Sequence, residues 1–355
     1  MNNDRIQEIL DLMEEARLDY FLISDPQSIA YCTGYYNDPH ERMFVFMISK
    51  HGNHTLFMND LFYLDHDLDV NIVWHKDGQD AIQTIVDEMH FPGRIGIDKN
   101  WASHFLLDLM KKLPDAKYIN ASPCVDLVRM KKDLQEQVLM IESSKINDAV
   151  MEEIIPFIQE GVTEKQLAKK LDELFFNHHS TCYGAIVAFG KNAADPHHEN
   201  DDTLLRKGDC VLIDMGCVYK WYCSDMTRTF FYEGILEEEI KVYEIVKKAN
   251  EAAEAMIKPG VKLSDIDKCA RKVISDEGYG KYFTHRLGHF IGRDVHEYGD
   301  VSLVNEMEVE EGMIFSIEPG IYLEGNFGVR VEDLVMVTKD GCQVLNSFTK
   351  DIYII

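Results

Sequence analysis

A long stretch of helical periodicity, from Leu127 to Ile158, separates two parts of the chain whose residue patterns differ. In the first part, apolar runs typical of strands alternate with amphipathic runs typical of helices, which indicates a small α/β domain. The expected strands are residues 19–24, 42–49, 54–59, 70–75 and 94–98, and the expected helices are residues 4–18, 79–90 and 101–113. A chain of 355 residues is long enough for two domains. We place them at residues 1–126 and 127–355, with the boundary at the start of the long helix.

The second part of the chain carries the polar residues that could perform chemistry. Strand-like segments rich in Gly, His and Asp follow residue 180, and expected helices at 236–257 and 263–277 interrupt them. A further helix is expected at 163–177, where "TEKQ" is a capping signal. Pro156 is expected to end or kink the long helix before it. We therefore expect the functional site after residue 180.

The charge of the chain excludes several classes of partner. Asp plus Glu is 62 against 36 for Lys plus Arg, which gives a formal net charge of −26. Such a surface repels nucleic acid and anionic membranes, and no apolar run approaches the roughly 20 residues that span a bilayer. The first residues do not resemble a secretory signal, and the eight cysteines form no CxxC pair. These observations favour a cytoplasmic protein with reduced thiols and no cysteine-ligated zinc.

Two aspartates are expected to face each other across a hairpin. Residues 209–232 read as two strands around a turn, and a turn centred on Tyr219-Lys220 pairs Asp214 with Asp225. Paired residues on antiparallel strands have Cβ atoms roughly 4.5–5.5 Å apart, and buried carboxylates that close require a cation between them. A divalent metal is the usual solution. The alternative is a solvated edge with two unrelated aspartates.

Two glutamates add to this pair. Glu318 lies at the end of the apolar strand in "MIFSIEPG", and Glu332 lies in "FGVRVEDLVMV". Glutamates are rarely buried without a partner, and each of these alone could pair with Arg330 or another base. Together with Asp214, Asp225 and one histidine, however, they make a five-ligand set. The four carboxylates would balance two divalent ions, and ligands that are mostly oxygen suit manganese, with zinc or cobalt as alternatives.

The order and local context of these residues resemble the creatinase/aminopeptidase P/prolidase family of metallopeptidases, the M24 or "pita-bread" enzymes. The matching strings are "IDMG…SDMTRTF", "HRLGHFIGRDVHE", "SIEPGIY" and "VRVEDLVMV". The segment "GAIVAFGKNAADPHHEN" resembles the part of the family that carries a substrate-binding histidine after a proline. The resemblance covers nearly the whole chain, and within the family the chain looks most like the Xaa-Pro dipeptidases (prolidases).

The resemblance implies an α+β architecture, in which a smaller α/β creatinase-type N-terminal domain precedes a C-terminal pita-bread domain with a curved antiparallel sheet backed by helices. It implies two divalent metal ions per subunit, usually manganese, and commonly a homodimer. The implied ligands are Asp214 (bidentate), Asp225 and Glu332 for one ion and Asp225, His289, Glu318 and Glu332 for the other. The implied reaction is hydrolysis of a small Xaa-Pro peptide by a hydroxide that bridges the metals.

The resemblance also implies roles for other residues of the site. Glu318 is expected to pass a proton to the leaving proline nitrogen. His197 and His296 are expected to donate hydrogen bonds to substrate oxygens, although an exposed turn is the alternative for His197, and we expect His198 in solvent. Independently of the resemblance, Arg330 lies two residues before Glu332 and hence on the same strand face. It is expected to orient a carboxylate ligand or the substrate, with an exposed surface arginine as the alternative.

Two histidines in "HRLGHFIGRDVHE" have the spacing of a helical metal pair. His285 and His289 are four residues apart, but Gly288 and Gly292 argue against a helix, and Arg286 stands where the helical zinc motif has a glutamate. Strand and loop geometry is the better prediction. In that geometry His289 is the metal ligand, and His285 supports the pocket or binds substrate.

Arg293 departs from the family pattern, in which many relatives have an apolar residue. A dipeptidase must recognise a free carboxylate directly after the scissile bond, and an arginine fork suits that group. We expect Arg293 to bind the dipeptide's C-terminus or to contact a covering loop. The candidate loop is "TGYYNDPHERMF", a solvated loop being the alternative. Its charged residues are Asp38, His40, Glu41 and Arg42.

Other functions stay open at this stage. An aminopeptidase P would cleave longer Xaa-Pro peptides. A methionine aminopeptidase shares the five ligands but normally lacks an α/β N-terminal domain. Creatinase-like enzymes and binding proteins of the family have lost the metals, and the five intact ligand positions argue against that class here.

Overall fold

A computed structural model describes residues 1–355. The chain divides into two compact units, residues 1–129 and residues 130–355. No helix in either unit combines the length with the apolar composition needed to traverse a lipid bilayer.

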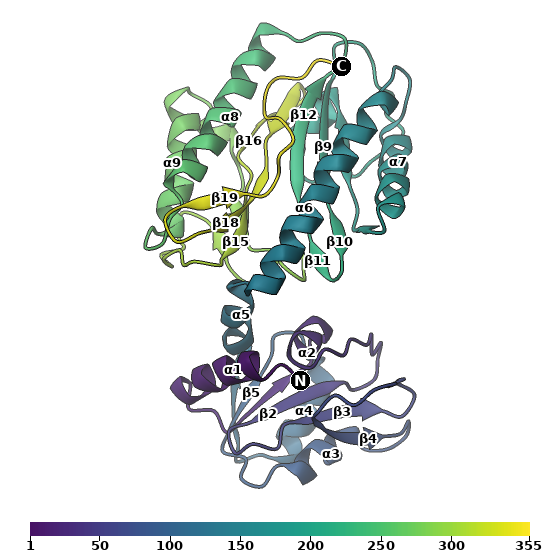
Figure 1. The fold of residues 1–355 in the computed structure, drawn as a ribbon, viewed down its shortest axis with the longest axis vertical. Coiled ribbons are helices and arrows are strands. Elements are labelled where there is room, and N and C mark those ends of the chain that lie inside the picture. Colours follow the sequence, from purple (N-terminus) through teal and green to yellow (C-terminus); the bar gives the residue numbers. More distant parts are fainter. The chain divides into compact units, whose positions relative to one another are not determined.

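The first unit is an α/β layer structure (Figure 1). Its elements are α1 (Asn3–Glu15), β1 (Tyr20–Ile23), α2 (Pro26–Thr33), β2 (Val45–Ser49), β3 (Thr55–Asn59), β4 (Asn71–His75), α3 (Ala81–Glu88), β5 (Arg94–Ile97), α4 (Ser103–Lys112), β6 (Lys117–Asn120) and α5 (Ser122–Met130). The strands form one mixed sheet in the order β4-β3-β2-β1-β5-β6. Phe21 and Ile23 pack with α1, α2 and α5, whereas Tyr20 and Leu22 pack with α3 and α4. Helices therefore cover both faces of the sheet, which explains why β1 is apolar throughout.

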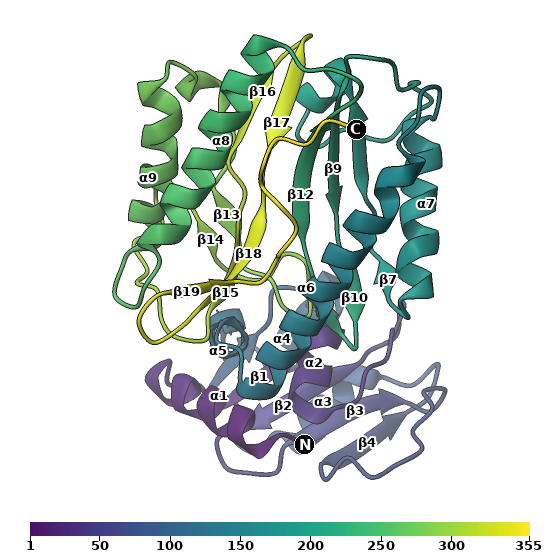
Figure 2. The same cartoon turned by 45° about the horizontal axis from the view of Figure 1, so that its top comes forward.

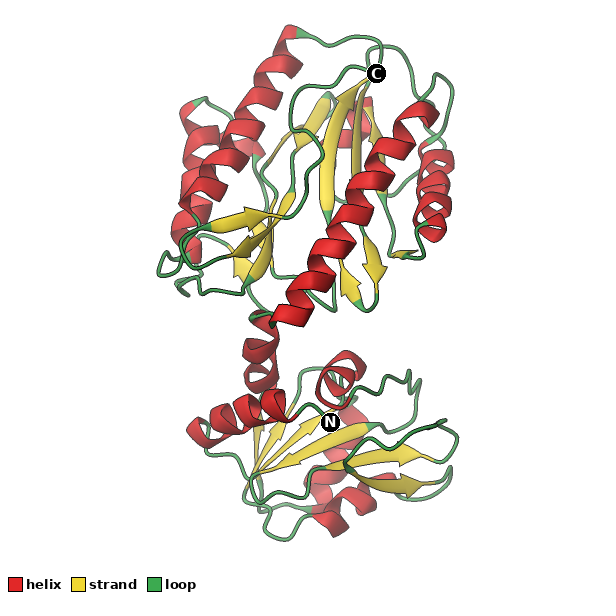
Figure 3. Cartoon of the chain, viewed as in Figure 1, coloured by secondary structure: helices red, strands yellow, loops and turns green.

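The second unit holds antiparallel strands with helices outside them (Figures 2 and 3). Its helices are α6 (Leu134–Ile154), α7 (Glu164–Asn177), α8 (Glu237–Met256) and α9 (Leu263–Asp276), with short 3-10 helices at Ile155–Phe157, Gly190–Ala194 and Gly280–Tyr282. Its strands are β7 (Thr181–Cys182), β8 (Ile186–Phe189), β9 (Cys210–Met215), β10 (Cys217–Tyr219), β11 (Tyr222–Cys223), β12 (Met226–Phe231), β13 (Gly288–His289), β14 (Asp300–Val301), β15 (Ile314–Ile317), β16 (Gly320–Leu323), β17 (Phe327–Arg330), β18 (Asp333–Val337) and β19 (Cys342–Val344).

The helices of the second unit are divided between two groups of strands. α6 and α7 share an apolar core with β8, β9 and β12. α8 packs against β15 to β17 and is tied to them by Asn250, whose Nδ2 donates to the carbonyl of Ile317 at 2.9 Å. An isolated bridge between Thr227 and Glu332 joins the two groups of strands. The helices pack against the outer face of the strands, so the polar residues lie on the inner face.

The prediction of one continuous helix from Leu127 to Ile158 is wrong. The structure has two helices, α5 and α6, because Asp133 caps the second. Its carboxylate accepts from the Glu136 amide at 2.9 Å, and Glu136 accepts from the Asp133 amide at 3.0 Å. This reciprocal capping box starts a new helix within a stretch whose periodicity looks uninterrupted. Pro156 falls in the 3-10 turn that ends α6, as predicted.

The predicted pairing of Asp214 with Asp225 is also wrong. The turn lies at Lys220 and Trp221, one residue later than expected, because both adopt positive φ of 47° and 74°, as in the tight turns that suit hairpins. Asp214 therefore pairs with Thr227. Asp225 lies in the break between β11 and β12, and both carboxylates still line one cavity.

Candidate active site

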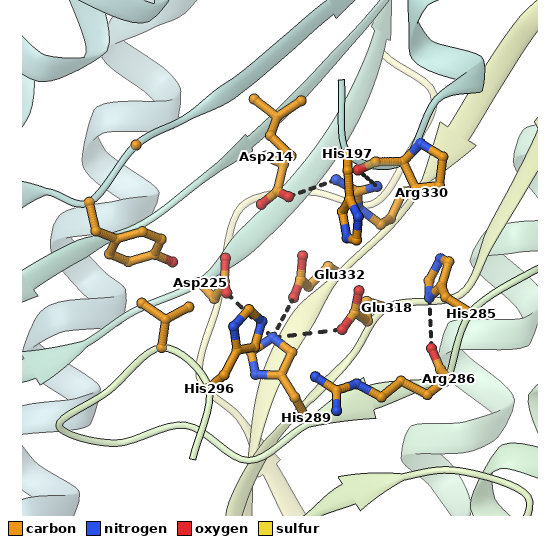
Figure 4. A pocket seen from close by; sticks show the side chains of 15 residues that line it. His197, Asp214, Asp225, His285, Arg286, His289, His296, Glu318, Arg330 and Glu332 are labelled. Carbon is orange, nitrogen blue, oxygen red and sulfur yellow. Dashed lines mark hydrogen bonds and ion pairs between the residues drawn. The ribbon is translucent and has the colours of Figure 1, made fainter. Parts of the chain in front are cut away.

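A cavity of about 710 Å³ in the second unit contains most of the predicted site residues (Figure 4). Its size is typical of a site for a small ligand. The residues that line it are Tyr183, Gly184, Ile186, Pro196, His197, Asp214, Asp225, His285, Arg286, His289, Val295, His296, Glu318, Arg330 and Glu332. The structure thus brings together all five predicted metal ligands and the predicted pocket residues His197, His285, His296 and Arg330.

Interruptions between strands present three of the four carboxylates. Asp225 lies between β11 and β12, Glu318 between β15 and β16, and Glu332 between β17 and β18. At each glutamate the backbone bonds another segment: the amide of Glu318 donates to Leu287 at 2.8 Å, and that of Glu332 to Thr227 at 3.1 Å. The breaks therefore turn the acidic side chains into the cavity while the backbone stays held.

His289 points its Nε2 atom at three carboxylates. That nitrogen lies 3.6 Å from Asp225, 3.7 Å from Glu318 and 4.0 Å from Glu332, and Figure 4 shows these contacts. The Nδ1 atom lies 3.2 Å from the carbonyl oxygen of Phe290 and donates to it, which leaves a lone pair on Nε2. Burial lowers the pKa of His289 to about 3. A neutral imidazole with its lone pair facing carboxylates has the form of a metal ligand.

The carboxylates crowd one another in a buried place. Burial raises the pKa of Asp225 well above its usual value, with a further rise from Asp214 and Glu318. Burial likewise raises the pKa of Glu332 well above its usual value and that of Glu318 to about 7. The ligand atoms of Asp225, His289 and Glu332 all lie within 4.8 Å of one another. This donor set fits divalent metal ions, because a cation would both balance the buried charges and accept the histidine lone pair.

Arg330 is a buried cation that the fold supplies to this cluster. Its Nη2 donates to Asp214 at 2.6 Å, its Nε to the Thr227 hydroxyl at 3.0 Å, and its Nη1 to the carbonyl of Pro196 at 3.3 Å. Nη1 also donates to the Tyr322 hydroxyl at 3.1 Å. The side chain is only 3% exposed, so Arg330 orients Asp214 from within the protein.

The predicted residues are held in place by Tyr322 and Thr227, neither of which was predicted from the sequence. The Tyr322 hydroxyl donates to Nε2 of His285 at 2.8 Å, because Nδ1 of that histidine donates to a carbonyl. Burial lowers the pKa of His285 to about 4 and raises that of Tyr322 to about 12. The Thr227 hydroxyl donates to Glu332 at 2.6 Å. Tyr322 lies in the string "SIEPGIY" and Thr227 in "SDMTRTF". Their position within these family-like strings is the sequence signal that could have identified them.

The loop that carries His197 is held by a buried glutamate. His198 is not in solvent as predicted, because its Nε2 donates to Glu164 at 2.6 Å and its side chain is only 12% exposed. Glu164 also accepts from the amide of Asp201 at 3.0 Å. The loop lies directly on β17, where a Cβ at Gly328 would come within 1.9 Å of the carbonyl oxygen of Ala193.

The other predicted residues lie in different surroundings. His296 lines the cavity, with its ring centre 4.3 Å from that of His289. The structure does not bring Arg293 to the cavity; its guanidinium lies over Trp221, 5.6 Å from the ring centre. The charged residues of the predicted covering loop belong to the first unit, where Arg42 donates to Asp77 at 2.9 Å. The roles of Arg293 and of this loop stay predictions.

The chain resembles two protein families and several known proteins. The sequence profile of metallopeptidase family M24 matches residues 138–339, and that of the creatinase/prolidase N-terminal domain matches residues 5–131. An uncharacterized peptidase of Staphylococcus aureus (strain bovine RF122 / ET3-1) is 34% identical over 355 residues, which covers 98% of this chain and 99% of the relative. The chain belongs to metallopeptidase family M24.

Two solved structures share this fold. A dipeptidase from Pyrococcus horikoshii OT3 superposes with a TM-score of 0.92 at 34% identity, covering 99% of this chain and 100% of that one. An Xaa-Pro dipeptidase from Bacillus anthracis gives 0.90 at 27% identity, covering 99% of each chain. The fold is therefore the predicted creatinase-type N-terminal domain followed by an M24 pita-bread domain. M24 metallopeptidases use divalent metals, for which the donor set described above is suited.

Proposed function

We propose that this M24 chain is a metal-dependent dipeptidase that hydrolyses Xaa-Pro dipeptides. The observation that carries the proposal is the convergence of Asp214, Asp225, His289, Glu318 and Glu332 on one cavity that His197 and His296 also line. The likeness to the Bacillus anthracis Xaa-Pro dipeptidase supports the choice of substrate class.

We propose that the five ligands hold two divalent ions, with Asp225 and Glu332 contributing to both. Carboxylate oxygens outnumber the single imidazole nitrogen, which favours manganese, with cobalt or zinc as alternatives. Bound ions would supply a nucleophile from water at neutral pH and would polarise the scissile carbonyl.

The protein side chains would position the substrate and move the proton. The nitrogen of an Xaa-Pro bond carries no hydrogen, so the leaving proline must receive a proton, and Glu318 would deliver it. His197 and His296 would donate hydrogen bonds to substrate oxygens as negative charge develops on them. Arg330 would keep Asp214 in position, and Tyr322 would keep His285 in position.

Two further parts of the proposal concern the state of the protein. All eight cysteines are free thiols, which is consistent with a reducing cytoplasm. A homodimer is proposed from the resemblance to the family. Light scattering of the purified protein at several concentrations tests it.

A dipeptide panel tests the proposed function. The metal-depleted protein is assayed on Xaa-Pro, Xaa-Ala and Xaa-Pro-Xaa peptides, with and without added Mn²⁺. The expected result is hydrolysis of Xaa-Pro dipeptides only after Mn²⁺ is added. Asp225→Asn removes a carboxylate ligand and should abolish activity. The control is Asp276→Asn, which removes an exposed carboxylate paired with Lys272 and should leave activity intact.

The same panel identifies the alternatives. A kcat/KM for Xaa-Pro-Xaa that equals or exceeds the value for Xaa-Pro would make the chain an aminopeptidase P. Absence of bound metal together with no rescue by Mn²⁺ would favour a metal-free member of the family.

A further inference from the structure

The cavity contains a cation that the mechanism above does not use. Of the residues that line the cavity, Arg286 and Arg330 carry a permanent positive charge. The side chain of Arg286 is 41% exposed, and Figure 4 shows it extending past Glu318 towards His289. Its nearest acidic partner is Asp300, at 3.9 Å from Nη1. That distance exceeds a hydrogen bond, so the Arg286 guanidinium has donors available to a ligand.

Arg330 cannot take the same part. Its guanidinium already donates to Asp214, Thr227 and Tyr322, and it is buried. Among the neighbouring histidines, His285 has a pKa of about 4 because burial and Arg330 disfavour its charged form, so it is neutral at pH 7. Arg286 is therefore the cation of the cavity whose charge is not already committed to a carboxylate by a hydrogen bond.

We infer that Arg286, rather than Arg293, binds a carboxylate of the substrate, and that this is the free C-terminal carboxylate of the dipeptide. The inference rests on the proposed function. An arginine fork pairs two N–H donors with the two oxygens of a carboxylate. Arg286 reaches the cavity three residues before His289, beside the metal ligands. A dipeptide places its carboxylate one residue beyond the scissile carbonyl, and a longer peptide or an amide presents no charge there.

Substrate pairs that differ only in the carboxylate test this inference. Wild type, Arg286→Met and Arg286→Lys are assayed with Ala-Pro, Ala-Pro amide and Glu-Pro in the presence of Mn²⁺. Arg286→Met should raise KM for Ala-Pro and lower its kcat/KM about 10- to 100-fold, while kcat/KM for the amide changes by no more than about twofold. Arg286→Lys should retain part of the preference for the free acid.

Matched controls separate recognition from folding. Arg206→Met removes an arginine whose side chain is exposed and outside the cavity, and it should leave both substrates unchanged. The metal content and melting temperature of each variant are compared with those of wild type. If Arg286→Met is unstable, Arg286→Lys alone gives the ratio of acid to amide.

Three outcomes would overturn the inference. One is an unchanged ratio of acid to amide, and another is an equal loss on both substrates in a folded, metal-loaded variant. The third is a loss confined to Glu-Pro, which would mean that Arg286 binds an acidic side chain instead. If wild type cleaves none of the peptides, the proposed function fails by itself. In that case, calorimetric binding of Ala-Ala and its amide to wild type and Arg286→Met still measures what Arg286 binds.

Discussion

The guanidinium of Arg228 donates a hydrogen bond of 2.7 Å to the backbone carbonyl of Glu332. It also donates to the backbone carbonyl of Thr227 at 2.9 Å and forms a 2.7 Å ion pair with Asp333. Arg228 and Asp333 are 1% and 0% exposed, and Lys350 reaches Asp333 from the other side at 2.8 Å. Thus the segment that presents Glu332 to the cavity is held from behind by a buried ionic cluster.

Breaking that cluster should destabilise the second unit. Arg228→Met removes one of the two cations that pair with buried Asp333 and deprives the buried carbonyls of Thr227 and Glu332 of their arginine donor, so the free energy of unfolding should fall by about 3–5 kcal/mol. Urea unfolding followed by circular dichroism measures the change. Lys247→Met, which breaks the pair with the exposed carboxylate of Asp351, is the control and should leave stability nearly unchanged. Equal effects of the two substitutions would contradict the assigned role of Arg228.

The Thr227 hydroxyl should matter for metal affinity more than for folding. It donates to Glu332 and accepts from Arg330, and partners that orient a metal ligand typically contribute about 10- to 100-fold in affinity. We expect Thr227→Val to weaken Mn²⁺ binding by that factor, as measured by isothermal titration calorimetry. Thr227→Ser keeps the hydroxyl and should bind Mn²⁺ as wild type does. If the valine and serine variants bind Mn²⁺ equally well, the hydroxyl has no such role.

Removal of metal should lower the melting temperature. Without a cation, burial raises the pKa values of Asp225, Glu318 and Glu332, and repulsion by neighbouring carboxylates raises them further. A ligand at about 100 times its Kd stabilises a protein by about 2.7 kcal/mol, which corresponds to about 5–10 °C here. Differential scanning calorimetry in chelator and in excess Mn²⁺ measures the difference. Glu332→Gln should reduce the increase in melting temperature that Mn²⁺ produces. A wild-type melting temperature that is the same in chelator and in excess Mn²⁺ would refute the metal site.

Loss of the Glu164 anchor should reduce catalysis and leave the metals in place. Glu164 accepts from His198 and from the amides of Phe189 and Asp201, so Glu164→Gln weakens the support of the loop that carries His197. We expect kcat/KM for Xaa-Pro dipeptides to fall about 10-fold, since small displacements of positioning groups are costly, with unchanged metal content by elemental analysis. Glu173→Gln, at an exposed pair with Lys170, is the control. A full loss of metal would mean that Glu164 supports the ligands instead.

The sequence predicted the architecture well because the signals for it are local. Apolar periodicity marks α7, α8 and α9, and the strings around Asp214, His289, Glu318 and Glu332 are contiguous in the chain. The hairpin register was predicted wrongly because it depends on the positive φ of Trp221, and aromatic residues rarely adopt positive φ. The break before α6 was not predicted because a capping box consists of the same polar residue types as the exposed face of a helix.

The contacts that complete the site could not be predicted in this way. Tyr322 bonds His285 and Arg330 across 37 and 8 residues of sequence, and Thr227 bonds Glu332 across 105. Such partners depend on how the strands pack in three dimensions, and a single sequence does not specify that packing. The position of Arg286 could not be predicted for the same reason. The sequence does not indicate whether Arg286 or Arg293 has a side chain that enters the cavity.

The close approach of Ala193 to Gly328 limits how substrate preference can change during evolution or in the laboratory. The loop that bears His197 and the strand that bears Arg330 leave no room for a side chain at position 328, so replacing Gly328 would force the two apart. Ile186 and Val295 also line the cavity, and single substitutions there would alter its shape while Gly328 is kept. Variation in substrate preference should therefore accumulate at such positions, while the glycine at position 328 is retained.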